Sequence, residues 1–111
     1  MKILIIDENL LMSSKLKSLS EKQNFGTRVL SFANLDTISE FSPDIVIINL
    51  ESKTNDVFDI VKNLNNVKTI GYCSHNKIDL AKKAKEYGVN FIATNSSIVH
   101  NFDEILKYFN H

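Results

Sequence analysis

The chain of 111 residues has one cysteine, Cys73, one proline, three glycines and no tryptophan. A lone cysteine excludes an internal disulfide and a metal site built from cysteines, which suits a reducing compartment. Basic and acidic residues number 13 each, so the positive excess that nucleic-acid binding usually needs is absent. No apolar run approaches the ~20 residues of a membrane span, and the run at residues 3–6 is too short for a signal peptide. We therefore expect a cytoplasmic protein that binds neither nucleic acid nor membrane.

Short apolar runs alternate with helical periodicity along the whole chain. Residues 3–6 and 45–48 are continuously apolar, which is typical of central parallel strands that are covered on both faces. After the first run, Met12, Leu16 and Leu19 recur with the spacing of an amphipathic helix. The continuing alternation predicts strands at residues 3–6, 27–32, 45–48, 67–73 and 91–93, and later helices at residues 35–41, from 57 to 64, 77–87 and 98–109.

Residues that favour helix ends mark the predicted boundaries. Asn24 and Gly26 suit the end of the first helix, and Gly88 suits the left-handed position after the fourth. Asn34 is expected to cap the second helix, and either Asn55 or Asp56 the third. The apolar spacing also predicts the core-facing side chains of the last two helices, which are Leu80, Ala81, Ala84 and Tyr87 in the fourth and Phe102, Ile105, Leu106 and Phe109 in the fifth.

Five successive β-α units with short connections predict an α/β fold, in which helices cover both faces of a doubly wound parallel sheet. For such a three-layer, flavodoxin-like (βα)5 domain the common strand order is 2-1-3-4-5, and residues 1–111 are expected to form a single domain of this kind. Any site is expected where strands 1 and 3 end. The polar residues that follow the first, third and fourth strands are Asp7, Glu8, Asn49, Ser74 and His75.

Taken together, these features resemble the receiver domain of bacterial response regulators (the CheY-like family) over essentially the whole chain. Residues 2–8 resemble its first strand with a terminal acidic pair, and residues 43–48 resemble the Pro-Asp and apolar run that leads to the phosphoacceptor. Ser74 falls where a serine or threonine ends the fourth strand. Residues 81–88 match the Ala-x-x-Ala-x-x-x-Gly pattern of the fourth helix.

The resemblance implies a phosphorylation pocket. In receivers an aspartate at the end of strand 3 becomes phosphorylated, and the acidic pair holds Mg²⁺ that neutralises the transferred group. By position, Asp7 and Glu8 are the corresponding Mg²⁺ ligands, and Ser74 would bond a phosphoryl oxygen. A lysine after strand 5 pairs with the phosphoryl group. An aromatic residue on strand 5 changes position on phosphorylation, and Phe91 occupies that place here.

The chain departs from the family at the decisive positions. Asn49 stands where the nucleophilic aspartate belongs, and a carboxamide carries no anionic oxygen. Thr94 stands at or next to the lysine position. The two losses compensate in charge, because Asp7, Glu8, Asn49 and Thr94 carry a net charge of minus two, as do the family's two acids, aspartate and lysine. We therefore expect a phosphorylation-independent pseudo-receiver, not an enzyme, with no cofactor beyond weak Mg²⁺ binding at Asp7 and Glu8.

A protein partner is expected on the face formed by the fourth helix, fifth strand and fifth helix, which receivers use for output and dimerisation, or on the first helix. The candidate contact residues on that face are Lys82, Lys83, Lys85 and Phe91. The expected partner is another signalling protein, such as a histidine kinase, an output protein or a second receiver. A homodimer through the same face is a further expectation.

Two other functions stay open. The chain could be a working receiver that is phosphorylated on a surrogate group at Glu8, Asp7 or Ser74. Alternatively, it could bind a small ligand or a metal ion on a flavodoxin-like scaffold, with His75 and Glu51 joining the acidic pair as metal ligands. A phosphate ligand is disfavoured because no glycine-rich loop follows the first strand.

Overall fold

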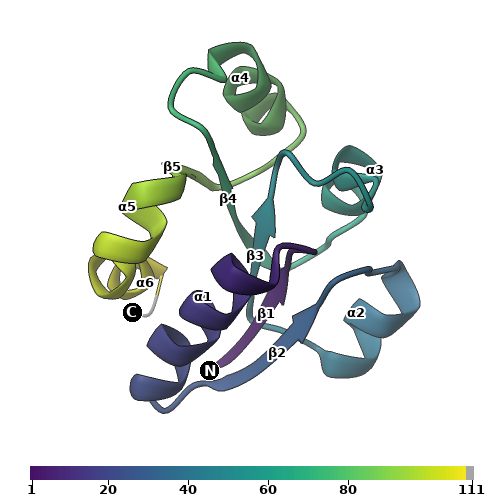
Figure 1. Ribbon diagram of the computed structural model, residues 1–111. Helices are drawn as coiled ribbons and strands as arrows, with labels where there is room; N and C mark the ends of the chain where they lie inside the picture. The colour runs from purple at the N-terminus through teal and green to yellow at the C-terminus, as the bar shows by residue number, and fades with distance from the viewer. Residues whose placement is uncertain (110–111) are drawn as a thin grey trace.

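The computed structural model describes residues 1–109. One parallel five-stranded sheet has the order β2-β1-β3-β4-β5, which confirms the predicted fold (Figure 1). The strands are β1 (Lys2–Ile6), β2 (Gly26–Leu30), β3 (Ile45–Asn49), β4 (Lys68–Cys73) and β5 (Phe91–Thr94). The helices are α1 (Leu10–Lys22), α2 (Leu35–Phe41), α3 (Val57–Lys62), α4 (Ile78–Glu86), α5 (Asn95–His100) and α6 (Phe102–Phe109). Within residues 1–109, none of these helices is long and apolar enough to cross a membrane.

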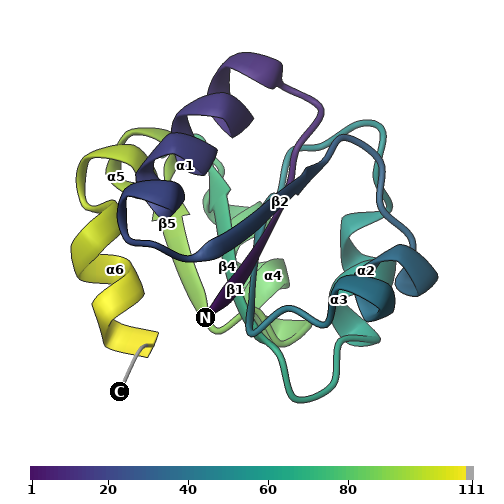
Figure 2. The same ribbon diagram turned by 90° about the horizontal axis from the view of Figure 1, so that it is seen from below.

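Helices cover both faces of the sheet and make three layers (Figure 1, Figure 2). α1, α5 and α6 pack on one face, and α2, α3 and α4 pack on the other. Successive strand residues point to opposite faces, so Ile3 and Ile5 belong to one hydrophobic cluster and Leu4 and Ile6 to the other. All four side chains are fully buried, and burial of each contributes about 1.5–3 kcal/mol to stability. The central strands therefore form a rigid base under the loops at their ends.

Side-chain caps fix where the helices begin. Asn9 accepts a hydrogen bond from the Met12 amide at the start of α1. Asn34 caps α2, as predicted, and forms a reciprocal pair with Thr37. Of the two candidates for α3, Asp56 is the cap. Each cap satisfies an amide donor of the first turn. The local sequence therefore determines where each helix begins, and with it the length of the loop before the helix.

The last helix was predicted as one segment at residues 98–109, and this prediction is wrong. α5 begins at Asn95, directly after β5, and the chain turns at Asn101 before α6 begins. Asparagine disfavours the interior of a helix, and Asp103 in the first turn of α6 favours a new helix start. Ile98 of α5 and Phe102 of α6 are both buried in the core.

The junction of α1 and β2 also differs from the prediction. Gly26 does not end the helix, because it is the first residue of β2. The left-handed residue after α1 is Asn24, with a φ of 61°, and asparagine tolerates that conformation. β2 ends at Leu30, so it is shorter than the predicted strand, and Phe32 beyond it is 60% exposed.

α4 contacts the core less than its apolar spacing predicted. Ala84 is its buried residue, whereas Leu80 and Ala81 are half-buried. Tyr87 was expected to face the core but is 41% exposed, because its ring packs against Phe58 of α3 with the ring centroids 4.9 Å apart. Gly88 has a φ of 106°, which confirms the predicted helix end.

Candidate functional site

Polar residues from three strands meet at the carboxyl edge of the sheet. Asp7 and Glu8 follow β1, Asn49 ends β3, and Ser74 follows β4. β1, β3 and β4 are neighbours in the sheet, so their carboxyl ends lie side by side. Asn49 bonds Asp7 directly, and both Glu8 and Ser74 bond the loop that follows β3. The sheet order therefore joins these residues into one hydrogen-bonded pocket.

Asp7 is the most deeply buried acid of the pocket, with 1% of its surface exposed. One carboxylate oxygen accepts hydrogen bonds from the Asn49 amide nitrogen at 3.1 Å and from the Asn9 backbone amide at 2.9 Å. The other oxygen accepts a short hydrogen bond from the Tyr72 hydroxyl. A buried carboxylate without such donors would cost several kcal/mol in lost solvation. Asp7 is thus held entirely by neutral donors.

The sequence did not reveal the role of Tyr72. Its side chain is 1% exposed and lies in the core cluster with α1, α5 and α6, but its hydroxyl reaches the carboxylate of Asp7. Burial, and then the hydrogen bond to Asp7, raise the pKa of the phenol well above its usual range, so the hydroxyl stays protonated and donates. Tyr72 is the sheet partner of Asn49. A tyrosine paired with Asn49 across the sheet was the signal that could have identified the role of Tyr72 in the pocket.

Glu8 anchors the loop between β3 and α3, residues 50–56. Its carboxylate accepts hydrogen bonds from the Ser52 hydroxyl at 2.6 Å, the Lys53 amide at 2.9 Å and the Thr54 amide at 3.3 Å. Desolvation alone would raise the pKa of Glu8, but these hydrogen bonds outweigh it and lower the pKa from 4.5 to about 2. The Glu8 carboxylate is therefore ionised at neutral pH and fully engaged by the loop.

Asn49 uses both ends of its carboxamide. The nitrogen donates to Asp7, and the oxygen accepts from the Glu51 backbone amide at 2.9 Å. An aspartate at this position could accept from Glu51 but could not donate to Asp7. The side chain thus bridges β1 and the loop after β3, and the bridge requires an amide.

Glu51 is a second pocket residue whose role the sequence did not show, because the sequence pointed to it only as a metal ligand beside His75. One oxygen of its carboxylate accepts hydrogen bonds from both the backbone amide and the hydroxyl of Ser74, at 2.8 and 2.9 Å. The Ser74 hydroxyl therefore already has an anionic acceptor inside the protein. Nearby Cys73 is 4% exposed, and burial followed by the negative charge of Glu51 raises the pKa of its thiol, so it packs as a small apolar residue.

Three of the other predicted positions do not join the pocket. The Thr94 hydroxyl bonds Ser96 and Ser97 and caps α5, so it serves the helix rather than the pocket. His75 is exposed, and no group of three or more His, Cys, Asp or Glu side chains within residues 1–109 could hold a metal ion. Phe91 is half-buried and packs edge-on against Phe109 of α6, with centroids 6.3 Å apart.

The lysines of α4 point to different neighbours. Lys82 and Lys85 border a shallow groove between α4 and β5 that also contains Ile92. The ammonium group of Lys83 instead lies 4.4 Å from the centroid of the Phe58 ring on α3. The candidate partner residues are therefore divided: Lys82 and Lys85 remain beside β5, Lys83 is turned toward α3, and Phe91 packs with α6.

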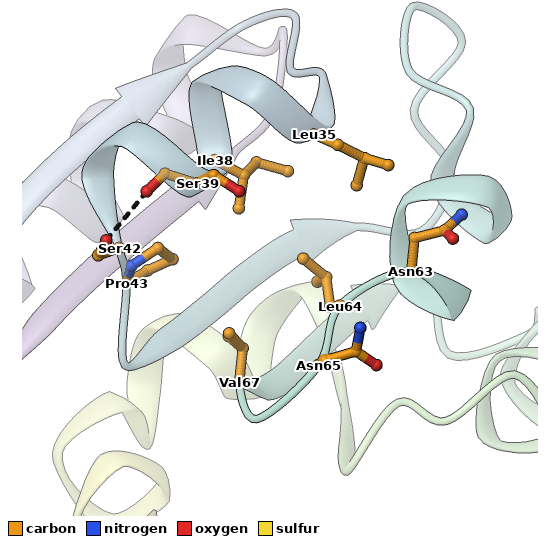
Figure 3. Close-up of a pocket in the computed structure, with 9 residues that line it drawn as sticks. All are labelled: Leu35, Ile38, Ser39, Ser42, Pro43, Asn63, Leu64, Asn65 and Val67. Atoms are coloured by element: carbon orange, nitrogen blue, oxygen red, sulfur yellow. Dashed lines mark hydrogen bonds between the residues drawn. The ribbon is translucent and has the colours of Figure 1, made fainter.

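A hollow on the described part of the chain lies away from this pocket (Figure 3). It has a volume of about 480 Å³ and is open between α2 and the segment that connects α3 to β4. Its lining contains no titratable side chain and consists of Leu35, Ile38, Ser39, Ser42, Pro43, Asn63, Leu64, Asn65 and Val67. The hollow therefore offers no charged acid or base.

Comparisons with known proteins found matches for the structure but none for the sequence. The sequence matches no family model and no curated protein. The structure matches the receiver domain of NtrX from Brucella abortus with a TM-score of 0.85 and 15% identity, over 97% of each chain. The fold is that of a receiver domain.

Two further solved structures support this result. A two-component response regulator from Clostridium difficile matches with a TM-score of 0.83 and 18% identity, over 97% of this chain and 93% of that chain. The beryllofluoride-activated NtrC4 receiver domain dimer matches with a TM-score of 0.82 and 17% identity, over 97% of this chain and 94% of that chain. A longer NtrX chain is covered over 27% of its length. At these identities the receiver domains share a fold with this chain, and the chemistry must be argued from its own residues.

Proposed function

We propose that this chain is an atypical receiver domain that acts through protein–protein contact without phosphorylation of its pocket. The observation that carries the proposal is the bonding of Asn49. At the end of β3, where a receiver's nucleophile would stand, the side chain is a carboxamide that donates to Asp7 and accepts from Glu51. An amide lacks the anionic oxygen that attacks phosphorus, and both of its ends are already used.

The remaining pocket groups support the same proposal. The Ser74 hydroxyl, which would bond a phosphoryl oxygen, donates to Glu51. Within residues 1–109 every buried side-chain nitrogen and oxygen has a hydrogen-bond partner. Thr94 offers no positive charge to a phosphoryl group. The pocket can therefore remain in one state without a phosphoryl group to complete it.

We propose no cofactor, and Mg²⁺ binding that is weak at most. The carboxylates of Asp7, Glu8 and Glu51 form no ion pair with a cation among the described residues, and this uncompensated charge would attract Mg²⁺. Against it, both oxygens of Asp7, both oxygens of Glu8 and one oxygen of Glu51 already accept hydrogen bonds from the protein. Because Mg²⁺ loses its hydration shell reluctantly and needs near-octahedral oxygen ligands, displacing those donors would consume most of the binding energy.

The proposed partner is another signalling protein, such as a histidine kinase, an output protein or a second receiver. Two features support the edge formed by α4, β5 and α5 as the contact face. Lys82 and Lys85 stand there beside Ile92, and exposed Ile78 lies at the start of α4. A structurally similar NtrC4 receiver domain is described as a dimer, so a homodimer of this chain is one form that the proposal allows.

An amide NMR titration with Mg²⁺ and then beryllofluoride tests the proposal, because beryllofluoride mimics an aspartyl phosphate. We expect the amides around Asp7, Asn49 and Ser74 to keep their positions. A shift of these amides that spreads into α4 and Phe91 would overturn the proposal and show a working switch. Phosphorylation on Glu8, Asp7 or Ser74 would instead appear as a mass increase with a small phosphodonor.

A further inference from the structure

The loop between β3 and α3, residues 50–56, is tied down from several directions. Glu8 accepts three hydrogen bonds from it, and Asn49 accepts one. From within the loop, Asn55 is 6% exposed and bonds the backbone of Ser31 and Ala33. Six hydrogen bonds that involve a side chain thus link this loop to the end of β3 and to the segments that follow β1 and β2. It is a fixed base from which Glu51 projects.

The loop between β4 and α4, residues 74–77, is held much less. Among residues 1–109, its only side-chain hydrogen bonds to another segment are the two that Ser74 makes with Glu51. His75, Asn76 and Lys77 are exposed. α4 begins without a side-chain cap, since Lys77 at its start makes none. The first turn of α4 therefore depends on the position of Ser74.

α4 itself adds few other anchors near this end. Ala84 is the buried residue of the helix, Leu80 in the first turn is half-buried against the core, and Ile78 at the start is 64% exposed. The contacts of Lys83 and Tyr87 with Phe58 lie at the other end. A helix with few buried contacts at one end is free to shift or fray there unless a specific bond holds it.

The donors of Ser74 converge on one oxygen of Glu51, at 2.8 Å from the amide and 2.9 Å from the hydroxyl. Two donors directed at one anionic oxygen form a charge-assisted contact that is stronger than a neutral hydrogen bond. We propose that the Glu51 carboxylate is a tethered internal anion that latches the β4–α4 loop to the fixed β3–α3 loop and so sets the position of the start of α4. The inference rests on the proposed function, for which it supplies the means by which the contact face is kept in one state.

Amide hydrogen exchange of the whole chain, with no ligand added, tests the latch. In Glu51→Ala we expect the amides from Ser74 through the first turn of α4 to exchange about ten-fold faster or more, because local opening no longer breaks a charged hydrogen bond. Amides of β1, β3 and α1 should keep their wild-type rates. Glu51→Gln, which keeps an acceptor oxygen without the charge, should give a smaller increase in the same region.

Two further variants make the result specific. Ser74→Ala removes only the hydroxyl donor and should accelerate the same amides to a smaller extent than Glu51→Ala. Glu40→Gln removes an equal charge from an exposed position on α2 and should change no rate near α4. The latch is overturned if Glu51→Ala leaves residues 74–81 at wild-type rates, or if all three pocket variants accelerate the whole chain uniformly. The exchange rates are measured without a phosphodonor or beryllofluoride. The latch can therefore be overturned while the proposed function stands, and the proposed function can fail while the latch stands.

Discussion

The two loops that follow β3 and β4 flank the same pair of strands, yet the protein holds them in different ways. Glu8 and Asn49 bond the β3–α3 loop from outside it, and Asn55 within the loop bonds the backbone beyond β2. The β4–α4 loop is bonded through Ser74 to Glu51. The pocket is therefore densely hydrogen-bonded at the end of β3, whereas its side-chain hydrogen bonds to the β4–α4 loop within residues 1–109 come from the Ser74–Glu51 pair. Substitutions at the two loops should therefore differ in how much stability they cost and in how far along the chain their effect extends.

Replacing Asn49 by aspartate should have the largest effect. Asn49→Asp places a second carboxylate at the position that now donates to Asp7 at 3.1 Å. Loss of that donor and repulsion between the buried Asp7 carboxylate and a second, half-buried anion should lower the free energy of unfolding by about 3 kcal/mol. Urea denaturation measures the change. Mg²⁺ should restore part of the loss, since it would bridge the two carboxylates.

Asn65→Asp is the matched control, because Asn65 is exposed and far from the pocket. It should unfold as the wild type does, with or without Mg²⁺. If Asn49→Asp were as stable as this control and equally insensitive to Mg²⁺, the amide bridge would have no role in holding the pocket.

Removing the Tyr72 hydroxyl should have the next largest effect. Tyr72→Phe leaves one oxygen of the buried Asp7 carboxylate without its donor. A buried acceptor left unsatisfied costs about 1–3 kcal/mol, which thermal or urea unfolding would detect. Tyr87→Phe keeps a ring on the surface and should be close to neutral. Equal stability of the two variants would contradict the assigned role of Tyr72.

Glu8 should make stability depend on acid pH. Its pKa is lowered from 4.5 to about 2 in the folded protein, so its contribution is complete above about pH 4.5 and is lost as the pH falls toward 2. Glu8→Gln should therefore be less stable than the wild type at neutral pH, and the gap should narrow across that range. The free energy of unfolding is measured against pH for the wild type and for Glu8→Gln. The curve of the control variant Glu40→Gln should run parallel to that of the wild type. A gap that stays constant down to pH 2 would rule out this contribution.

The smallest effect is expected at the α4 side, where Lys83 lies over Phe58. Lys83→Ala removes an exposed cation–π contact worth about 0.5–1 kcal/mol. Lys82→Ala removes the same charge from the groove beside β5 and should be near neutral for stability. A melting-temperature difference between the two variants measures the contact. If Lys82→Ala were the more destabilising change, the division of the lysines between two neighbours would be incorrect.

The sequence predicted what depends on periodicity and chain order. Continuous apolar runs identify β1 and β3, and the strand order then places Asp7 and Asn49 at one edge. It did not predict the partners of those residues. Tyr72 reads as a core residue, and only the register that pairs it with Asn49 brings its hydroxyl to Asp7. Glu51 lies in a loop without periodicity, so nothing in the sequence directs it to Ser74.

The break between α5 and α6 shows a second limit. Ile98, Phe102, Ile105 and Phe109 have the spacing of one continuous amphipathic helix. The spacing is equally satisfied by two helices that turn at Asn101, because both arrangements bury the same apolar side chains. The apolar spacing therefore does not reveal the break, although Asn101 and Asp103 favour it.

Intact-mass analysis of the wild-type protein after incubation with acetyl phosphate and Mg²⁺ tests the central claim most directly. The account predicts an unchanged mass, because Asn49 offers no nucleophile and the Ser74 hydroxyl donates to Glu51. A mass increase of one phosphoryl group, mapped to Asp7, Glu8 or Ser74, would contradict it and establish a phosphorylated receiver.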